Sequence, residues 1–284
     1  MRSDMKRYVK AVMFVLVLVL VATFSVSCAD TKENLFSINI INGEEIHITK
    51  YHGKSNRISV PAEIKGLPVT GVTSNAFWGN TEAVSIVLPD SVEVIGNNAF
   101  FSCKSITSFN IPKSLKELGD NAFTGCDNLK SITVTVGNEY FISKDGVLFD
   151  KDMTKLIIYP ARKTGKQYTV PAGITHLGRN AFCNNTYLTE IILPEGLVEI
   201  GPTAFKNCSG ITKMEIPEGT ESIRASAFWD CVNLESVNFP ASVNNIGEQV
   251  FYGCSKLTVI YVKEGSFAHQ WCEDNSRTAG MEFY

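Results

Sequence analysis

The sequence lacks the short motifs that identify the common enzyme classes. There is no Gly-x-Ser-x-Gly nucleophile elbow, no His-Glu-x-x-His zinc motif, no phosphate-binding loop and no dinucleotide-binding fingerprint. The four histidines (His47, His52, His176 and His269) are scattered, and no cysteines follow the paired Cys-x-x-Cys spacing of a zinc site. We therefore predict no catalytic residues, no metal and no cofactor. An enzyme with an unrecognised site, assembled from distant residues, is the least favoured function.

The chain also has no block of basic residues. Its 26 lysines and arginines are outnumbered by 29 acidic residues, and its net charge is −3 at pH 7. Proteins that bind nucleic acid carry clustered positive charge, and so do segments that adhere to anionic lipid surfaces. The composition therefore argues against a nucleic-acid partner and against attachment to a membrane surface through charge.

One long apolar run is present, near the N-terminus. Four basic residues precede it, residues 11–24 carry no charge, and the sequence Ser25-Val26-Ser27-Cys28 follows. The run is too short to span a bilayer comfortably, so this arrangement predicts a secretory signal peptide over residues 1–27.

The cysteine after these small residues resembles a bacterial lipobox, in which Cys28 is lipidated and becomes the first residue of the mature chain. Ser25 stands where that motif usually has leucine, which leaves an ordinary signal peptide cut nearby as the alternative. We predict an exported lipoprotein at the outer membrane or cell surface, with the periplasmic face as the alternative. Its membrane attachment is the N-terminal lipid alone, followed by a tether over residues 28–35.

A 23-residue pattern repeats along the rest of the chain. Pro171, Pro194, Pro217 and Pro240 are spaced 23 residues apart. The copies share an apolar residue before the proline, an Ile-Gly or Leu-Gly pair, an Ala-Phe pair, and a cysteine or asparagine three residues after the phenylalanine; Thr220, Arg224 and Val250 depart from this pattern. A fixed period of this length is typical of a solenoid, in which each coil buries its apolar face against the next. We expect repeats over 60–134 and 170–262, forming a curved right-handed stack of about seven to eight coils in the α/β to mainly β class.

Each part of the repeat predicts a local structure. Alternating apolar residues before the proline predict a short strand, the Ile-Gly pair a second extended piece, and Asn-Ala-Phe a brief helical turn that directs the phenylalanine inward. The phenylalanines at this position should form one buried column: Phe77, Phe100, Phe123, Phe182, Phe205, Phe228 and Phe251. Five ladder cysteines alternate with Asn80 and Asn185, which favours free buried thiols over disulfides: Cys103, Cys126, Cys208, Cys231 and Cys254.

Three segments fall outside this repeat. Residues 36–59 contain Asn42-Gly43 between two alternating runs, which predicts an N-terminal hairpin cap. Residues 135–169 read as a β-hairpin insertion with a turn at Asp145-Gly146, and we expect it to bulge from the stack without breaking it. Residues 263–284 should form a C-terminal cap, in which Trp271 covers the last coil.

The repeated Ile/Leu-Pro, Ile/Leu-Gly, Ala-Phe and Cys/Asn positions resemble the BspA-like, treponemal-type leucine-rich-repeat family. The Asp145 to Phe149 insertion and the Gly265 to Ala268 ending are similar to that family too. The resemblance covers residues 36–272, and it implies a leucine-rich-repeat solenoid. It also implies an exported or surface-attached protein, and some members of the family act as adhesins. It implies neither a shared ligand nor catalytic residues.

The solvent face of the strands before each proline is the candidate binding surface. About eight strands at ~4.8 Å spacing give a face of roughly 35–40 Å, long enough for a protein partner. The other interpretation of these positions is a solvated sheet of small polar residues. The candidate residues are Ser85, Ser108, Asn110, Ser131, Thr133, Thr169, Glu190, Lys213, Glu215, Ser236, Asn238 and Tyr261. Aromatic residues of the insertion make a second candidate patch: Tyr140, Phe141, Tyr159 and Tyr168.

From these observations we predict a lipid-anchored binding protein of the cell envelope or surface. Its partner would be a host or envelope protein, or a glycan. A periplasmic structural scaffold is the alternative function, because the same exposed face could hold another envelope protein.

Overall fold

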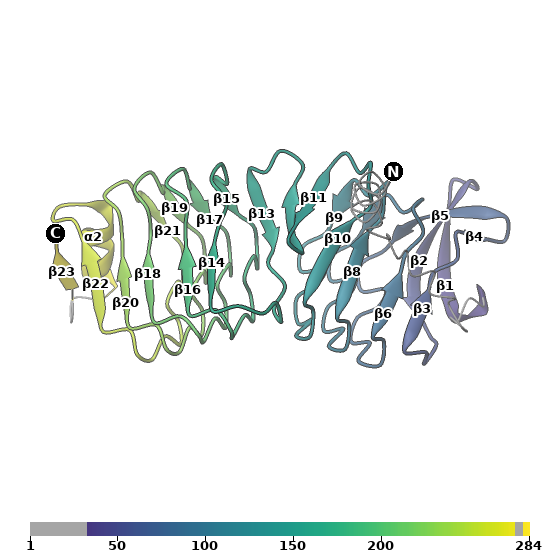
Figure 1. Cartoon of the computed structure of the whole chain (residues 1–284), viewed down its shortest axis with the longest axis horizontal. Helices are drawn as coiled ribbons and strands as arrows, with labels where there is room; N and C mark the ends of the chain where they lie inside the picture. The colour runs from purple at the N-terminus through teal and green to yellow at the C-terminus, as the bar shows by residue number, and fades with distance from the viewer. Residues whose placement is uncertain (1–32, 276–280) are drawn as a thin grey trace, which may run out of the picture.

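The computed structural model describes residues 33–275 and 281–284 as an elongated β-solenoid of about ten turns with a spacing of about 23 residues. Figure 1 shows the strands side by side along the long axis, from β1 at the purple end to β23 at the yellow end. The expected seven to eight coils are therefore too few. Turns that carry only part of the motif, in the insertion and at both ends, also add strands to the stack.

The strands before the prolines, and the strands β10, β22 and β23 that continue their row without a proline, lie along one side of the solenoid, which we call ladder A. Its members are β3 (Arg57–Ser59), β6 (Ser85–Val87), β8 (Ser108–Ile111), β10 (Ser131–Val134), β14 (Gln167–Thr169), β16 (Glu190–Ile192), β18 (Lys213–Glu215), β20 (Ser236–Asn238), β22 (Val259–Val262) and β23 (Met281–Phe283). Hydrogen bonding divides them into four parallel groups: β3–β6, β8–β10, β14–β16 and β18–β20–β22–β23. β3 and β14 were assigned from the sequence to the cap and the insertion, yet both pair as coil strands.

The Ile-Gly positions form a second row of short parallel strands, which we call ladder B. Its members are β2 (Glu45–Tyr51), β5 (Leu67–Val72), β7 (Val94–Ile95), β9 (Glu117–Leu118), β13 (Lys155–Ile158), β15 (His176–Leu177), β17 (Glu199–Ile200), β19 (Ser222–Ile223) and β21 (Asn245–Ile246). Among the described strands, β9 ends one hydrogen-bonded sheet and β13 belongs to the next. Glycine follows the strand because the preceding coil is close: a Cβ on Gly96 would lie 2.4 Å from the Ser74 backbone nitrogen.

The Ala-Phe segments form a third side, which we call the turn ladder (residues 75–80, 98–103, 121–126, 180–185, 203–208, 226–231 and 249–254). The expected helical turn is wrong. The backbone makes successive i→i−3 bonds, such as Phe101 N–H to the Asn98 carbonyl, with left-handed φ at Asn98 and Ser102. Alternate N–H groups then point along the stack, and Phe100 N–H donates to the Ala122 carbonyl of the next coil at 2.9 Å.

The predicted burial of the phenylalanines is confirmed, but the insertion divides them into two columns, Phe77 to Phe123 and Phe182 to Phe251, instead of the expected single one. All seven rings are buried, and neighbouring centroids lie 5.0–5.5 Å apart wherever Phe rings of successive coils meet. Tyr51 and Tyr159, which the sequence analysis did not place in the column, stack on Phe77 and Phe182 at 5.8 and 5.1 Å. Burial of each such ring stabilises the fold by roughly 1.5–3 kcal/mol.

The ladder cysteines are buried thiols and not disulfides, as the sequence analysis favoured. Their thiols donate to the carbonyl of the phenylalanine one coil back, for example Cys103 to Phe77 at 3.1 Å and Cys231 to Phe205 at 3.0 Å. Asn185 fills the same position and accepts a backbone N–H from Leu188. Cysteine and asparagine alternate there because both are small and both bond the loop backbone.

The insertion does not bulge from the stack; it interrupts it. β11 (Phe141–Lys144) and β12 (Val147–Asp150) form an antiparallel hairpin, and β13 then joins ladder B. Leu148 packs in an N-terminal hydrophobic cluster, whereas Val147 and Phe149 pack in a C-terminal one. The core is therefore divided in two at the insertion.

Short elements close the two ends. At the N-terminal end are η1 (Glu33–Leu35), β1 (Phe36–Ile41), which pairs with β2 around the Asn42-Gly43 turn, and β4 (Glu63–Ile64). At the other end α2 (Phe267–Asp274) begins at the N-cap Ser266, and Trp271 packs edge-on against Phe239 and Phe251. None of the helices in residues 33–275 and 281–284 is long and apolar enough to cross a membrane.

Candidate functional site

A groove of about 720 Å³ lies on ladder A, across β16, β18 and β20. Its lining brings together four residues predicted from the sequence, which are Glu190, Lys213, Glu215 and Asn238. The pattern of outward residues two apart on successive strands puts them in register, with Lys213 beside Ser236 and Glu215 beside Asn238. We call this surface the ladder A groove.

The charged side chains of the ladder A groove are exposed and unpaired. Among the described residues, no ion pair or side-chain hydrogen bond engages Glu190, Lys213 or Glu215. Glu218, which lines the same groove, uses a carboxylate oxygen to accept the Ala241 N–H at 3.0 Å. Three carboxylates against one ammonium make the groove negatively charged.

Two further features give the groove mixed character. Asn238 Oδ1 is buried and accepts no hydrogen bond from any residue that the structure describes. Ile192 and Tyr284 are 41% and 57% exposed, and both line the groove. Tyr284 is fixed there because its hydroxyl donates to the Phe239 carbonyl at 2.7 Å, and desolvation raises the pKa of that hydroxyl.

The other predicted face residues lie elsewhere on ladder A. Ser108, Asn110 and Thr133 are exposed on β8 and β10, where Thr133 donates to Asn110 Oδ1 at 2.9 Å. Thr169 is exposed on β14 beside Ile192, and Tyr261 is half-buried beside Asn238. Ser85, Ser131 and Ser236 are half-buried, so they contribute less to any contact surface.

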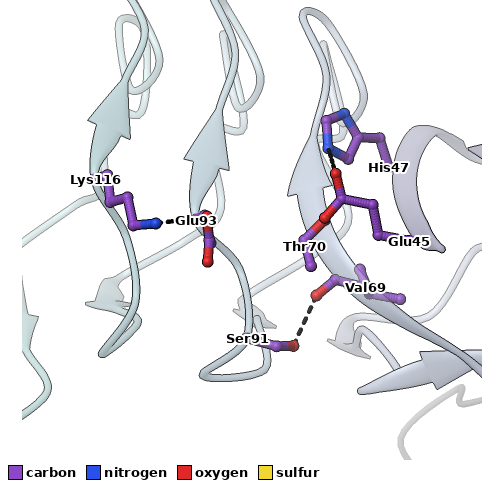
Figure 2. A network of polar contacts seen from close by, with 7 residues as sticks. All are labelled: Glu45, His47, Val69, Thr70, Ser91, Glu93 and Lys116. Carbon is purple, nitrogen blue, oxygen red and sulfur yellow. Dashed lines mark hydrogen bonds and ion pairs between the residues drawn. The ribbon is translucent and has the colours of Figure 1, made fainter. Parts of the chain in front are cut away.

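Ladder B has polar residues too, and several of them bond to one another between coils. Figure 2 shows the N-terminal part of this row, in which Thr70 donates to Glu45 at 2.7 Å and Lys116 pairs with Glu93 at 2.8 Å. That hydrogen bond raises the pKa of Lys116. Farther along, Arg224 pairs with Glu199 at 2.6 Å. Two ion pairs of ladder B therefore bridge neighbouring coils, whereas Glu190, Lys213 and Glu215 of the ladder A groove have no charged partner among the described residues.

The remaining candidate groups do not assemble into a reactive site. Within the described ranges, no three histidine, cysteine or acidic side chains cluster as metal ligands. Phe141 and Tyr159 of the insertion patch are buried, which leaves Tyr140 as its exposed aromatic residue. Cys28 lies outside the described residues.

The candidate binding residues chosen from the sequence did not include Ile192, Glu218 or Tyr284. The repeat places Ile192 two residues before Pro194, the same outward position as Glu215, so the spacing predicts its exposure. Tyr284 gave no such signal, because it reaches the groove through β23, which pairs with β22 without carrying the motif.

Comparison with known families identifies the repeat. The BspA type leucine-rich-repeat region matches residues 57–154 and 162–270 in six copies, which is more than half of the chain. A search among curated proteins finds no significant match.

Solved structures share the fold. The pneumococcal vaccine antigen PcpA is 23% identical with a TM-score of 0.60, and the match covers 81% of this chain and 80% of that one. A leucine-rich-repeat protein from Eubacterium ventriosum is 19% identical with a TM-score of 0.55, covering 82% and 77%. One from Bacteroides ovatus is 22% identical with a TM-score of 0.54, covering 84% and 66%.

Proposed function

Because this chain belongs to the BspA-type leucine-rich-repeat family, we propose that it is an exported, lipid-anchored protein whose ladder A groove binds a protein partner. The family and fold are typically those of non-enzymatic binding modules. Extended sheet faces are the surfaces through which solenoids bind. The observation that carries the proposal is the groove itself, which gathers the unpaired charges of Glu190, Lys213 and Glu215 on adjacent strands.

The charge of the groove favours a partner that offers cations and hydrogen-bond donors. Opposite potentials across an interface steer association and disfavour wrong partners. A basic protein surface therefore fits the three carboxylates better than an acidic glycan does. The exposed Ile192 and Tyr284 add an apolar contact and a rigid aromatic one, the kinds of residue on which interface affinity depends.

The binding test reverses two charges in the groove. The variant Glu190→Lys with Glu215→Lys should bind immobilised matrix and envelope extracts at least ten-fold more weakly, because the groove becomes positively charged. A factor of ten corresponds to about 1.4 kcal/mol of binding free energy. The matched control is Glu221→Lys with Glu248→Lys, two exposed acids outside the groove. Equal weakening by both variants, or by neither, would count against the groove.

The anchor is tested separately. Replacing Cys28 by Ala should move the protein from the membrane fraction to the soluble fraction of the cell, because the proposed attachment is the lipid alone. Continued membrane retention would refute the lipid anchor. Protease treatment of intact cells then distinguishes surface exposure, in which the protein is cleaved, from a periplasmic scaffold, in which it is protected. The shared fold of the pneumococcal vaccine antigen is consistent with the exposed outcome.

A further inference from the structure

A second cavity lies where the insertion interrupts the stack, away from the ladder A strands. This cleft has a volume of about 330 Å³ and separates the turn-ladder segment 121–126 from the segment 180–185. Phe123, Phe141 and Tyr159 give it apolar walls, and Asp120 and Arg179 lie at its polar rim. Small-molecule sites have volumes of about 300–1,000 Å³. The cleft is therefore the size of a few residues rather than of a folded partner.

The backbone on both sides of the cleft is incompletely hydrogen bonded. In the preceding coil, the N–H groups of Asn98, Phe100 and Ser102 donate to the next coil at 2.9, 2.9 and 2.8 Å. The equivalent N–H groups of Asn121, Phe123 and Gly125 have no backbone acceptor within the described ranges, and all three residues line the cleft.

The opposite wall shows the complementary deficit. In the coil beyond it, the carbonyls of Pro202, Ala204 and Lys206 each accept an N–H from the coil before. In segment 180–185 and the residue before it, the Ala181 carbonyl accepts from Tyr159 at 2.7 Å. The carbonyls of Arg179 and Cys183 accept no backbone N–H from the part of the chain that the structure describes. One wall thus presents donors at alternate residues and the other presents acceptors.

The insertion explains this deficit. Elsewhere in the turn ladder, each stretch that has a coil on both sides accepts N–H groups from the preceding coil and donates its own N–H groups to the following coil. Here the chain enters as β13 and supplies only Tyr159 to the turn ladder before leaving at Pro160. Tyr159 stacks on Phe182, while Phe123 makes its ring contacts with Phe100 and Phe109 on the other side.

From this geometry we propose that the cleft binds a short peptide segment with an aromatic side chain, which adopts the turn-ladder conformation and takes the place of the missing stretch. In the turn-ladder conformation, N–H groups of alternate residues point to one neighbouring coil and carbonyls of the residues between them point to the other, as with Phe100 N–H and the Ala99 carbonyl, which is what the two walls require. The aromatic side chain fits against Phe123 and Phe141. Lys155, which also lines the cleft and has no ion pair among the described residues, favours a carboxylate at one end of the segment.

Side-chain clasps hold the two walls at a fixed separation. Asn180 Nδ2 donates to Asn121 Oδ1 at 2.5 Å, Arg179 pairs with Asp120 at 3.2 Å, and Asn184 donates to Asp127 at 3.1 Å. These clasps are bonds between exposed or half-buried side chains, so they can part around a peptide without disturbing backbone bonds. The walls therefore need little ordering when the segment binds.

The probe is a blocked, fluorescently labelled pentapeptide that reproduces residues 121–125, Asn-Ala-Phe-Thr-Gly, and binding is followed by fluorescence anisotropy. The purified protein should bind it saturably. A peptide with alanine in place of the phenylalanine should bind at least ten-fold more weakly. Absence of binding up to millimolar concentration, or equal binding of the two peptides, would overturn the proposal.

The matched protein variants are Ala161→Trp, which fills the cleft, and Ala172→Trp, which places the same side chain at an exposed position outside it. Peptide affinity should fall at least ten-fold in the first and stay unchanged in the second. If Ala161→Trp does not fold, Thr124→Arg blocks the same cleft from another residue. Full affinity in a folded cleft variant would overturn the proposal.

A further variant tests whether the peptide binds in the ladder A groove instead of the cleft. The Glu190→Lys, Glu215→Lys protein should keep full peptide affinity, because neither residue lines the cleft. Loss of peptide binding in that variant would assign the peptide to the groove instead and overturn the cleft proposal. The expected peptide binding by this variant does not depend on whether the ladder A groove binds a partner, so the two proposals can fail separately.

Discussion

At the scale of single residues, the position before each Ala-Phe pair requires a left-handed backbone. Asn75, Asn98, Asn121 and Asn180 have φ between 56° and 64° there, and asparagine tolerates this conformation better than most residues. Thr203, with φ 55°, is the β-branched exception. Its hydroxyl donates to Asn180 Oδ1 at 2.7 Å, a bond that an asparagine amide can replace.

We therefore expect Thr203→Asn to stabilise the protein. Left-handed backbone costs on the order of 1–3 kcal/mol for an unsuitable residue, so relief of part of that strain should add about 1 kcal/mol. The shift of the urea midpoint of unfolding measures this gain in stability. The control is Thr212→Asn, at an exposed position that flanks a strand. A lower midpoint for Thr203→Asn would mean that the threonine hydroxyl contributes more than the strain costs.

The ladder thiols also make a prediction at this scale. Burial raises the pKa of Cys103 from 9.0 to about 12. The unfolded thiol loses its proton near pH 9 while the native thiol keeps it. Its contribution to stability is therefore complete below pH 9 and declines as pH rises from there towards 12.

Cys103→Ser should reduce this pH dependence, because the serine hydroxyl can donate to the Phe77 carbonyl but does not titrate in that range. Urea midpoints of the two proteins between pH 8 and 10.5 make the comparison. The variant should lose less stability per pH unit than the parent. Identical slopes would show that the Cys103 thiol does not contribute.

At the scale of elements, the hairpin of β11 and β12 is positioned by its turn. Asp145 and Gly146 have φ of 51° and 77°, and the Gly146 carbonyl accepts the Ile132 N–H of β10 at 2.9 Å. A Cβ on Gly146 would lie 2.6 Å from Ser131 Oγ. The turn therefore needs glycine both for its backbone and for its contact with ladder A.

The cap hairpin provides a matched comparison. Gly43 has the same φ of 77° and nothing within 4 Å of its Cβ position. Gly43→Ala should cost about 1 kcal/mol from backbone strain alone. Gly146→Ala should cost more, and Ser131→Ala should recover part of the difference. Thermal or urea unfolding measures all three, and equal costs at the two glycines would show that the Ser131 contact is relaxed easily.

At the scale of the whole molecule, the divided core predicts divided unfolding. Repeat proteins are stabilised by contacts between neighbours, and the N- and C-terminal hydrophobic clusters are distinct here. Calorimetry should therefore resolve two transitions. Phe100→Leu should lower only the transition temperature of the N-terminal cluster, and Phe205→Leu only that of the C-terminal cluster. A single transition shifted by both variants would mean that the insertion couples the halves fully.

The period of 23 residues was sufficient to predict the solenoid, the burial of the phenylalanines and the buried thiols, because each follows from which residue recurs. The coil count and the insertion were less predictable. Tyr159 and β13 take coil positions without the motif, since one aromatic ring and one extended stretch satisfy the neighbouring coil.

The candidate site was predictable in part for the same reason. Alternation along the strand identifies outward residues such as Lys213 and Glu215, but not whether their charges have partners. Pairing between coils, as in Glu93 with Lys116, depends on rotamers across a 23-residue separation, which no local pattern specifies. The ladder A groove therefore emerged only from the structure.

The interrupted step has a mechanical consequence. Across the cleft, side-chain clasps connect segments that backbone hydrogen bonds connect elsewhere in the turn ladder, and ladder B is discontinuous between β9 and β13. If the protein is tethered at one end and gripped by a partner near the other, tensile load along the long axis concentrates on this joint. Under such a load the two halves of the solenoid should separate at the cleft first. The molecule would then lengthen while each half stays folded.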